Sequence, residues 1–396
     1  MDPAELALLR SPEGVQLLES MPRFDPADDA LRRVTSLRQH GHPAELVSAV
    51  LTQSRLRAKA RAKFGEASDR MLFTQAGLEQ ATRLPVARVH AQRFVDAGCR
   101  VVADLGCGIG GDALALAQAG LQVLAVDADE TTAAIAAHNL APFAAATAQH
   151  GTAENASLDG VDGVFLDPAR RTTSGGVTHR RSDAAEYTPS LDFAFGLAAE
   201  RPVGVKLGPG TDRDVIPAGA EAQWISVDGD VVELGVWVGA VARPGVGRAA
   251  LLLHGGQTHE LTAPADSPDA EVGPLGEYLH EPDGSVIRAR LIGDLVRQHG
   301  GAMVSDGIAY FSTGHPIASP FASSFRVIDE LPTDERRLRQ ALQTRGIGVL
   351  EIKKRGVDVD PAKLRSRLRL KGDVAATIVL TRIGGRHTTL LVERVT

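Results

Sequence analysis

The sequence predicts an α/β protein whose central part is a parallel sheet with crossover helices. Within residues 93–243, short runs of Val, Leu and Ala alternate with alanine-rich stretches of helical spacing, which is the order typical of such a sheet. Residues 1–92 show helical spacing without strand-like runs, and residues 244–396 mix strands with helices. A chain of 396 residues is long enough for several cores, so we expect three domains with these boundaries.

The composition is ordinary for a globular protein, and it narrows the function classes. Hydrophobic residues make up 43% of the chain, charged residues 23%, and the net charge is −6. We expect no membrane span, because no apolar run approaches the roughly 18 residues that one needs, and no signal peptide. The two cysteines, Cys99 and Cys107, are too few for a four-thiolate zinc site or a disulfide framework. We therefore expect no metal and a cytoplasmic location.

The N-terminal domain is expected to be helical and to carry a basic segment. Apolar residues recur at helical spacing in residues 43–64, and Pro43 stands where a first helical turn would begin. Within this stretch, residues 54–63 read SRLRAKARAK and hold five basic residues without an acid. This segment is either a phosphate-binding face or a solvated helix face.

Seven strands are expected in the central domain. Asp228, Gly229 and Asp230 separate the last two and predict a hairpin turn, so the sheet would begin as parallel and end with an antiparallel pair. A further hairpin, residues 249–263, is expected to open the C-terminal domain. The seven strands are placed at residues 100–105, 122–126, 146–150, 163–167, 203–207, 222–227 and 231–240.

The loop after the first strand is rich in glycine and suits either of two cofactor classes. Residues 104–111 read DLGCGIGG, which fits both the G-x-G-x-x-G pattern of dinucleotide-binding loops and the pattern D-x-G-x-G-x-G. Both classes need a tight turn in which the backbone comes close to the cofactor. The first pattern uses Gly106, Gly108 and Gly111, and the second uses Asp104, Gly106, Gly108 and Gly110.

Asp104 favours the second pattern. This residue lies at the carboxyl end of the first strand, where its carboxylate would repel the pyrophosphate of a dinucleotide. S-adenosylmethionine (SAM) has no phosphate, and its ammonium and sulfonium groups attract a carboxylate. Asp127, at the end of the second strand, does not discriminate, because an acid there can bind the ribose of either cofactor. We therefore expect SAM rather than NAD or FAD, with a ligand-free glycine turn as the remaining alternative.

With this loop and a sheet that ends in a hairpin, residues 93–243 resemble a class I SAM-dependent methyltransferase domain, which has a Rossmann-like seven-stranded sheet. Members of this family often carry an acid after the third strand that contacts adenine. Here Thr152 occupies that position, and Glu154 follows two residues later as a weaker candidate. The resemblance implies that Asp104, Gly106, Gly108 and Gly110 hold the methionine end of SAM and that Asp127 holds its ribose.

The end of the fourth strand carries the substrate signal. Residues 163–171, GVFLDPARR, resemble the element in which nucleic-acid amino-methyltransferases have Asp or Asn, two prolines and an aromatic residue. Oxygen atoms of that element accept hydrogen bonds from the target amino group. Here an alanine and an arginine replace the second proline and the aromatic residue, and a guanidinium can stack on a base or bind phosphate. The predicted catalytic residues are Asp167, Pro168 and Arg170, with Arg171 and Lys206 as further residues of the same cleft.

Two alternatives bear on this element. Asp167 and Pro168 could simply end the strand. A uracil C5 methyltransferase has a similar element, but it needs a cysteine nucleophile after the fifth strand. The corresponding residues 205–212 read VKLGPGTD, which contains no cysteine, so this chemistry is not expected.

The flanking segments resemble parts of known methyltransferases. The C-terminal residues resemble the THUMP-like domain of bacterial, notably actinobacterial, methyltransferases, most clearly at Lys354-Arg355-Gly356, and this implies an α+β domain. Residues 63–94 resemble the segment that precedes the SAM loop in cap-guanine-N2 methyltransferases. That resemblance implies that Phe73 and Thr82 lie near SAM.

Together these features predict a SAM-dependent methyltransferase that acts on an RNA base, with an amino nitrogen favoured as the acceptor. Residues 334–371 hold twelve Lys and Arg against five Asp and Glu, so this segment and residues 54–63 are the expected RNA contacts. Two alternatives stay open. One is a methyltransferase for a small molecule or a protein, and the other is a protein that holds SAM or RNA without turnover.

Overall fold

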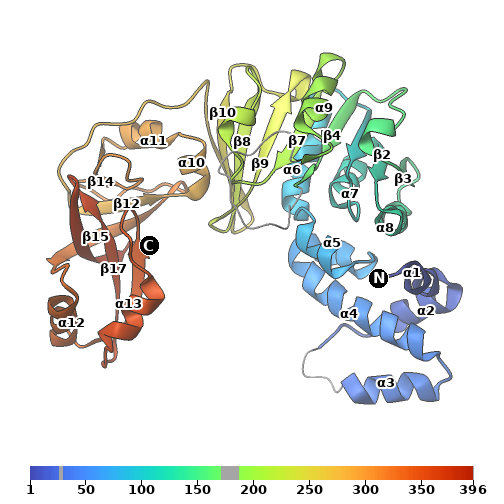
Figure 1. Ribbon diagram of the computed structural model, residues 1–396, viewed down its shortest axis with the longest axis horizontal. Coiled ribbons are helices and arrows are strands. Elements are labelled where there is room, and N and C mark those ends of the chain that lie inside the picture. The colour runs from blue at the N-terminus through green and yellow to red at the C-terminus, as the bar shows by residue number, and fades with distance from the viewer. Residues whose placement is uncertain (26–29, 171–186, 396) are drawn as a thin grey trace. The chain divides into compact units, whose positions relative to one another are not determined.

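The computed structural model describes residues 1–25, 30–170 and 187–395, which form two compact units (Figure 1). Arg171, an expected substrate contact, lies outside these ranges. Within them, no helix is both long and apolar enough to cross a membrane. The same ranges contain no group of three or more His, Cys, Asp or Glu side chains that could hold a metal ion. The first unit comprises Met1–Glu221 with Gly235–Arg243, and the second comprises Ala222–Leu234 with Pro244–Thr396.

The N-terminal part of the first unit is helical, as the sequence predicts. Side-chain caps explain where its first helices begin, because Asp2 accepts a hydrogen bond from the backbone of Glu5, and Ser11 from that of Gly14. Proline follows each cap at the first helical position, where its missing N–H costs nothing. The elements are α1 (Pro3–Arg10), α2 (Pro12–Ser20), α3 (Ala30–Gln39), α4 (Ala44–Phe64), η1 (Gly65–Asp69), α5 (Gln75–Gln80) and α6 (Leu84–Asp96).

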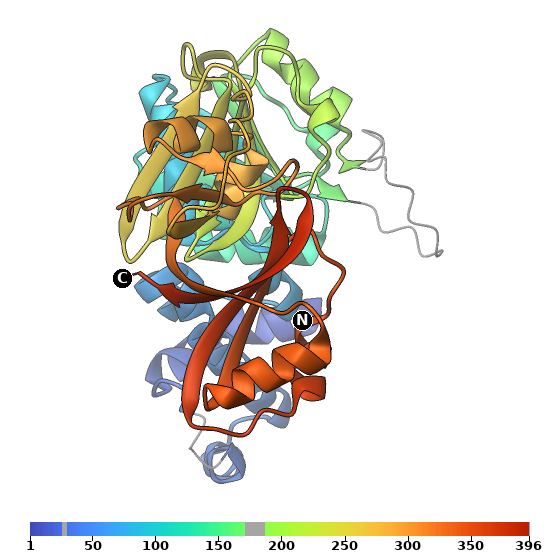
Figure 2. The same cartoon turned by 90° about the vertical axis from the view of Figure 1, so that its left-hand side faces the viewer.

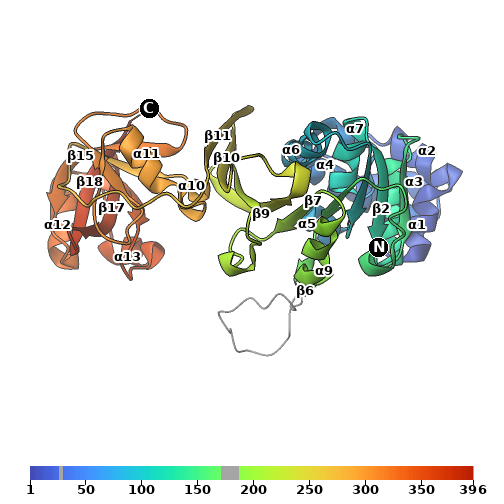
Figure 3. The ribbon, with the colours of Figure 1, turned by 90° about the horizontal axis from the view of Figure 1, so that it is seen from above.

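The parallel strands of the first unit end at one common edge. The register pairs Leu105 with Val126 on one side and with Leu166 on the other, so the residues that follow these strands lie close together. Helices α6 and α7 cover one face of the sheet and α9 the opposite face (Figure 3). The elements are β1 (Val101–Leu105), α7 (Gly111–Gln118), β2 (Gln122–Asp127), α8 (Glu130–Leu140), β3 (Ala146–His150), β4 (Gly163–Leu166), α9 (Leu191–Gly196) and β7 (Val203–Leu207).

All seven expected strands are present, and two more, β10 and β11, extend the described part of this sheet, in the order β11-β10-β8-β9-β7-β4-β1-β2-β3. Strands β8 (Glu221–Val227) and β9 (Asp230–Val238) form the expected hairpin, with Asp228 and Gly229 at positive φ. The next hairpin extends this sheet, because β10 (Arg248–His254) pairs parallel to β8 and β11 (Gln257–Ala263) follows it. Both strands belong to the second compact unit. This pairing covers the open edge that β8 would otherwise present.

The second unit contains another sheet, in which seven described strands follow the order β13-β14-β12-β15-β18-β17-β16. Helices α12 and α13 pack their leucines on one face of it (Figure 2). This α+β arrangement agrees with the predicted class. The elements are β12 (Tyr278–Pro282), α10 (Gly284–Arg288), α11 (Ile292–Gln298), β13 (Ala302–Met303), β14 (Phe311–Thr313), β15 (Ala322–Leu331), α12 (Glu335–Thr344), β16 (Ile347–Lys354), α13 (Pro361–Leu368), β17 (Val374–Ile383) and β18 (Arg386–Arg394).

Candidate active site

The loop between β1 and α7 needs the glycines that the sequence places there. Gly106, Gly108 and Gly110 have φ values of 82°, 55° and 85°, in the left-handed region that favours glycine. A Cβ atom on Gly106 would also lie 3.2 Å from the carbonyl oxygen of Asp167. The glycine therefore lets the end of β4 approach the loop, and it brings the expected cofactor and substrate elements together.

Asp127, the last residue of β2, ties that strand to the loop. One carboxylate oxygen accepts a hydrogen bond from the backbone N–H of Gly108 at 2.9 Å, and the other accepts one from Asp129 at 2.9 Å. Burial raises the pKa of Asp127, and these two backbone N–H groups oppose the rise. Each carboxylate oxygen has a second lone pair, so the side chain can still accept hydrogen bonds from ribose hydroxyls.

Asp104 is the most deeply buried acid of the site. Its side chain is 1% exposed, and its Oδ2 atom has no hydrogen-bond partner among the described residues. Burial raises the pKa of Asp104 well above its usual range, and the negative charges of Asp112 and Asp167 add to the rise. Leaving such an oxygen without a donor is costly. A cationic donor such as the ammonium of SAM would satisfy it, so the residues present fit this cofactor.

The segment before α6 closes onto the glycine loop. The side chain of Asn139, in α8, accepts a hydrogen bond from the backbone N–H of Leu72 at 2.7 Å and donates one to the carbonyl of Ile109 at 2.8 Å. A Cβ atom on Gly77 would lie 2.5 Å from the side chain of Ile109. Phe73 is fully buried in this contact region. The structure thus brings residues 72–82 against the loop, while a contact between Phe73 and SAM stays a prediction.

A chain of polar side chains runs from the end of β4 into the core. The Nζ atom of Lys206 donates to Oδ2 of Asp167 at 2.5 Å and to Oγ1 of Thr82 at 3.1 Å. The Thr82 hydroxyl in turn donates to Oδ2 of Asp112 at 2.6 Å. The Nδ1 atom of His90 lies 2.8 Å from Oδ1 of Asp112, and its ring is 1% exposed. This polar chain links the expected substrate residue Asp167 to the segment that closes on the cofactor loop.

Asp112 and His90 belong to this polar chain, but sequence analysis did not single them out. Burial alone would raise the pKa of Asp112, but the pKa is lowered overall, with the hydrogen bond and charge of His90 as the main opposing causes. Lys206 and Thr82 act in the same direction. The only sequence signal for Asp112 was its position, directly after the last glycine of the loop and on the side of α7 that faces the core.

The remaining expected site residues lie at the same edge of the sheet. Pro168 is buried, whereas Arg170 is exposed in the short strand β5 (Ala169–Arg170), which pairs with β6 (Tyr187–Thr188). Thr152 is exposed at the start of η2 (Ala153–Asn155), one residue after Gly151, whose N–H donates to the carbonyl of Asp127. Glu154 is exposed as well. Contacts of these residues with ligands stay predictions.

The basic segment of residues 54–63 is largely engaged within the protein. Arg57 donates to the carbonyl of Met71 at 2.9 Å, and Arg61 pairs with Asp69 at 3.0 Å. Lys63 donates to three backbone carbonyls, those of Leu78, Glu79 and Ala81. These bonds hold α4 against the following turn. The exposed cations of this segment are Arg55 and Lys59.

The second basic segment, residues 334–371, is also partly engaged. Lys353 pairs with Glu281 at 2.7 Å, and Arg367 with Glu335 at 2.9 Å. Arg365 donates to the carbonyl of Leu350 but remains exposed. Several other cations of the segment face solvent and could meet an anionic partner: Arg336, Arg337, Lys354, Arg369 and Lys371.

Comparisons with known proteins identify the family. An uncharacterized S-adenosylmethionine-dependent methyltransferase of Mycobacterium tuberculosis, found in two strains, is 36% identical over 339 residues, which cover 83% of this chain and 91% of that protein. The chain belongs to the SAM-dependent methyltransferases. This methyltransferase therefore takes SAM as its cofactor, as Asp104 and the glycine loop predict, and the dinucleotide alternative is wrong.

Two further comparisons describe the parts of the methyltransferase. Residues 322–394 match the model of the THUMP domain-like family, which confirms the predicted C-terminal resemblance, and residues 2–60 match a domain of unknown function. A crystal structure of a candidate methyltransferase from Porphyromonas gingivalis W83 has the same fold, with a TM-score of 0.76 and 20% identity. That match covers 100% of this chain and 99% of the other.

Proposed function

We propose that this methyltransferase transfers a methyl group to an exocyclic amino nitrogen of an RNA base, with Asp167 orienting the acceptor. One observation carries the proposal. The backbone of Asp167 lies against the glycine loop, so close that a Cβ atom on Gly106 would meet its carbonyl oxygen at 3.2 Å. The Asp-Pro element thus stands beside the loop that is expected to hold the methionine end of SAM.

The roles of the chain's residues follow from this arrangement. Bound SAM supplies an activated methyl group on its sulfonium. Asp104 and Asp127 bind the cofactor through a buried and a half-buried carboxylate, respectively. The carboxylate and carbonyl of Asp167 accept hydrogen bonds from the acceptor amino group and orient its lone pair. When the new N–C bond forms, the nitrogen carries an extra proton, which the carboxylate of Asp167 is placed to receive.

Lys206 serves as a positioning residue in this proposal. Its ammonium lies 2.5 Å from Asp167 and is only 14% exposed, so it stabilises the ionised carboxylate and fixes its direction. The hydroxyl of Thr82, bound to buried Asp112, holds Lys206 from the other side. These contacts hold Lys206 in place and, through it, the carboxylate of Asp167.

Three observations support RNA as the substrate class. The Asp-Pro element resembles that of nucleic-acid amino-methyltransferases. Residues 322–394 match the THUMP domain-like family, and THUMP domains proper bind RNA. Exposed cations remain in the segment 334–371, although the chain as a whole has a net charge of −6.

One observation favours the alternative of a small-molecule or protein substrate. Most of the cations of residues 54–63 are engaged in contacts within the protein, so this segment contributes less to a basic face than its composition predicts. The two substrate classes are separated by incubating the full chain with methyl-labelled SAM and with RNA, protein and small-molecule fractions from cells that lack it. Label in the RNA fraction is the expected result. Label confined to another fraction would contradict the proposal.

A further inference from the structure

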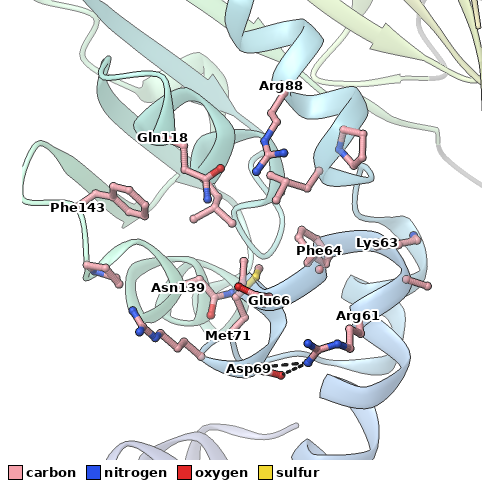
Figure 4. Close-up of a pocket in the computed structure, with 18 of the residues that line it drawn as sticks. Arg61, Lys63, Phe64, Glu66, Asp69, Met71, Arg88, Gln118, Asn139 and Phe143 are labelled. Carbon is pink, nitrogen blue, oxygen red and sulfur yellow. Dashed lines mark hydrogen bonds and ion pairs between the residues drawn. The ribbon is translucent and has the colours of Figure 1, made fainter. Parts of the chain in front are cut away.

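The first unit contains a half-open pocket of about 1000 Å³ (Figure 4). It is bounded by α4 and η1, by the start of α6, by Leu114 and Gln118 of α7, and by the end of α8 with the turn that follows. Its walls include Asn139, whose side chain holds Leu72 and Ile109 beside the cofactor loop. The expected cofactor and catalytic residues are not among its lining residues, although Arg61 and Lys63 of the basic segment 54–63 are, so the pocket is separate from the methyl-transfer site.

The pocket is positively charged in a protein that is negative overall. The described residues that line it include five cations and two acids. Arg23 and Arg61 share one partner, Asp69, at 3.5 and 3.0 Å. Arg70 and Arg88 are exposed at its walls. The full set of charged lining residues is Arg23, Arg61, Lys63, Arg70, Arg88, Glu66 and Asp69.

His138, in the pocket wall, adds no charge to the pocket. Burial lowers the pKa of His138 in the pocket wall, and the charges of Arg10 and Arg57 lower it further, although a hydrogen bond to the backbone of Arg70 opposes the shift. The imidazole is therefore neutral at physiological pH, and the net positive charge of the pocket comes from its arginines and Lys63.

The pocket also offers apolar surface. Phe64 and Met71 are buried in its wall, and Phe143 is partly exposed at its far side, opposite Arg61 (Figure 4). Apolar rings and thioethers are the surfaces on which a nucleobase packs, and guanidinium groups bind phosphate. The volume lies at the upper end of the range for small-molecule sites and can hold one or two nucleotides.

We propose that this pocket binds a nucleotide of the RNA substrate other than the methylated one. Its phosphate would lie against Arg70 and Arg88, and its base against the partly exposed Phe143. The inference rests on the proposed RNA substrate, and it assigns the N-terminal region a part in binding. The pocket lies outside the site that holds the methyl acceptor, so a substrate that fills both must be longer than a single nucleotide.

Binding to a fluorescent single-stranded RNA at several salt concentrations tests this proposal. In the full chain, Arg70→Gln with Arg88→Gln should weaken binding by on the order of tenfold and flatten the salt slope by about 1.4, the loss of two phosphate contacts. The matched control is Arg38→Gln with Arg100→Gln, two exposed arginines of the same unit outside the pocket, which should change affinity less than about twofold. Calorimetric SAM binding shows that each variant is folded.

Photocrosslinking with RNA that contains 4-thiouridine locates the nucleotide, and crosslinks should fall in the peptide that contains Phe143. Equal binding by the pocket variant and the wild type would overturn the proposal, as would equal losses in pocket and control variants.

Methyl transfer to the RNA is measured in a separate assay. RNA that binds through the pocket without being methylated would contradict the proposed function only, whereas methylation with unchanged binding by the pocket variant would contradict the pocket alone.

Discussion

The Nζ atom of Lys206 lies 2.5 Å from Oδ2 of Asp167 and 3.1 Å from Oγ1 of Thr82. These residues come from the end of β7, the end of β4 and the segment before α6. One ammonium thus joins the substrate element to the segment that closes on the cofactor loop. The side chain of Lys206 is 14% exposed, so solvent screens this ion pair less than a surface pair.

Replacing Lys206 by methionine should lower the rate of methyl transfer by about a hundredfold, because Asp167 loses the charge that orients it. The expected loss is in kcat, with SAM affinity within about twofold of wild type. Lys206→Arg keeps the charge and should recover part of the rate. Single-turnover transfer and calorimetry measure the two quantities. If the methionine variant kept the wild-type rate, Lys206 would have no positioning role.

Replacing Asp104 by asparagine should weaken SAM binding about tenfold or more, because a charged hydrogen bond is lost.

The same substitution should change how the stability of the ligand-free protein depends on pH. The raised pKa of Asp104 means that the folded state binds its proton more tightly than the unfolded chain, so its contribution to stability falls as pH rises above the usual carboxyl range. Asparagine does not titrate, so the stability of the Asp104→Asn variant should not fall with pH for this reason.

Thermal unfolding of both proteins without ligand at about pH 5 and about pH 8 tests the charge effect. The difference in melting temperature, variant minus wild type, should be larger at about pH 8 than at about pH 5. A variant that binds SAM as tightly as wild type would remove Asp104 from the cofactor site.

His280, in the second unit, should make stability depend on pH. The imidazole is fully buried between Ser324 and Thr313, and burial lowers its pKa to about 4, with the charges of His299 and His315 adding to the shift. Because the folded pKa is below the unfolded value, the unfolded chain takes up the proton first. Stability is lost as pH falls from about 6.5 to about 4, by up to about 3 kcal/mol.

His280→Gln removes this titration. Urea unfolding at about pH 7 and about pH 5 should show a smaller drop in the free energy of unfolding for the variant than for wild type. Equal drops would mean that His280 is not held neutral in the folded protein.

Glu221 should be essential for the stability of the first unit. This fully buried carboxylate accepts hydrogen bonds from the guanidinium of Arg93 at 2.6 and 2.9 Å and from that of Arg243 at 2.6 Å. Burial would raise its pKa, but the hydrogen bonds of Arg243 and Arg93 outweigh burial and lower it. Glu221→Gln leaves buried positive charge without its partner and should cost about 3–5 kcal/mol in urea unfolding.

The exposed pair of Glu393 with Arg326 supplies the matched control. Glu393→Gln should change stability little, because solvent screens that pair. If Glu221→Gln and Glu393→Gln lowered the free energy of unfolding equally, the burial of Glu221 would not explain its contribution to stability.

The parts of the site that were predictable depend on local sequence. Asp104 and the three glycines lie within one loop, and their spacing alone fixes a turn with positive φ. Asp127 was predictable because it ends a strand next to that loop, and parallel strands end at a common edge. The charge of Asp104 also separated SAM from a dinucleotide, since electrostatic repulsion needs no tertiary information.

The parts that were missed depend on tertiary packing. His90 and Asp112 are 22 residues apart, and only the contact of α6 with α7 brings them together. Strand β10 is a continuous apolar run in which residues 249–252 are all buried, a pattern common to interior strands, so its sequence did not reveal which sheet it joins. Lys63 counts as a basic residue in the sequence, whereas its backbone carbonyl partners appear only in the fold. Composition therefore overstated the phosphate-binding capacity of this segment.

The most direct test of the proposed function is nucleoside mass spectrometry after reaction with methyl-labelled SAM and RNA from cells that lack this protein. The wild type should place the label on an exocyclic amino nitrogen of one nucleoside. Asp167→Ala should lose that product while still binding SAM, and Asp159→Ala, a substitution of an exposed carboxylate, should retain it. Label on a ring carbon or a ribose oxygen, or an undiminished product from the Asp167 variant, would contradict the account.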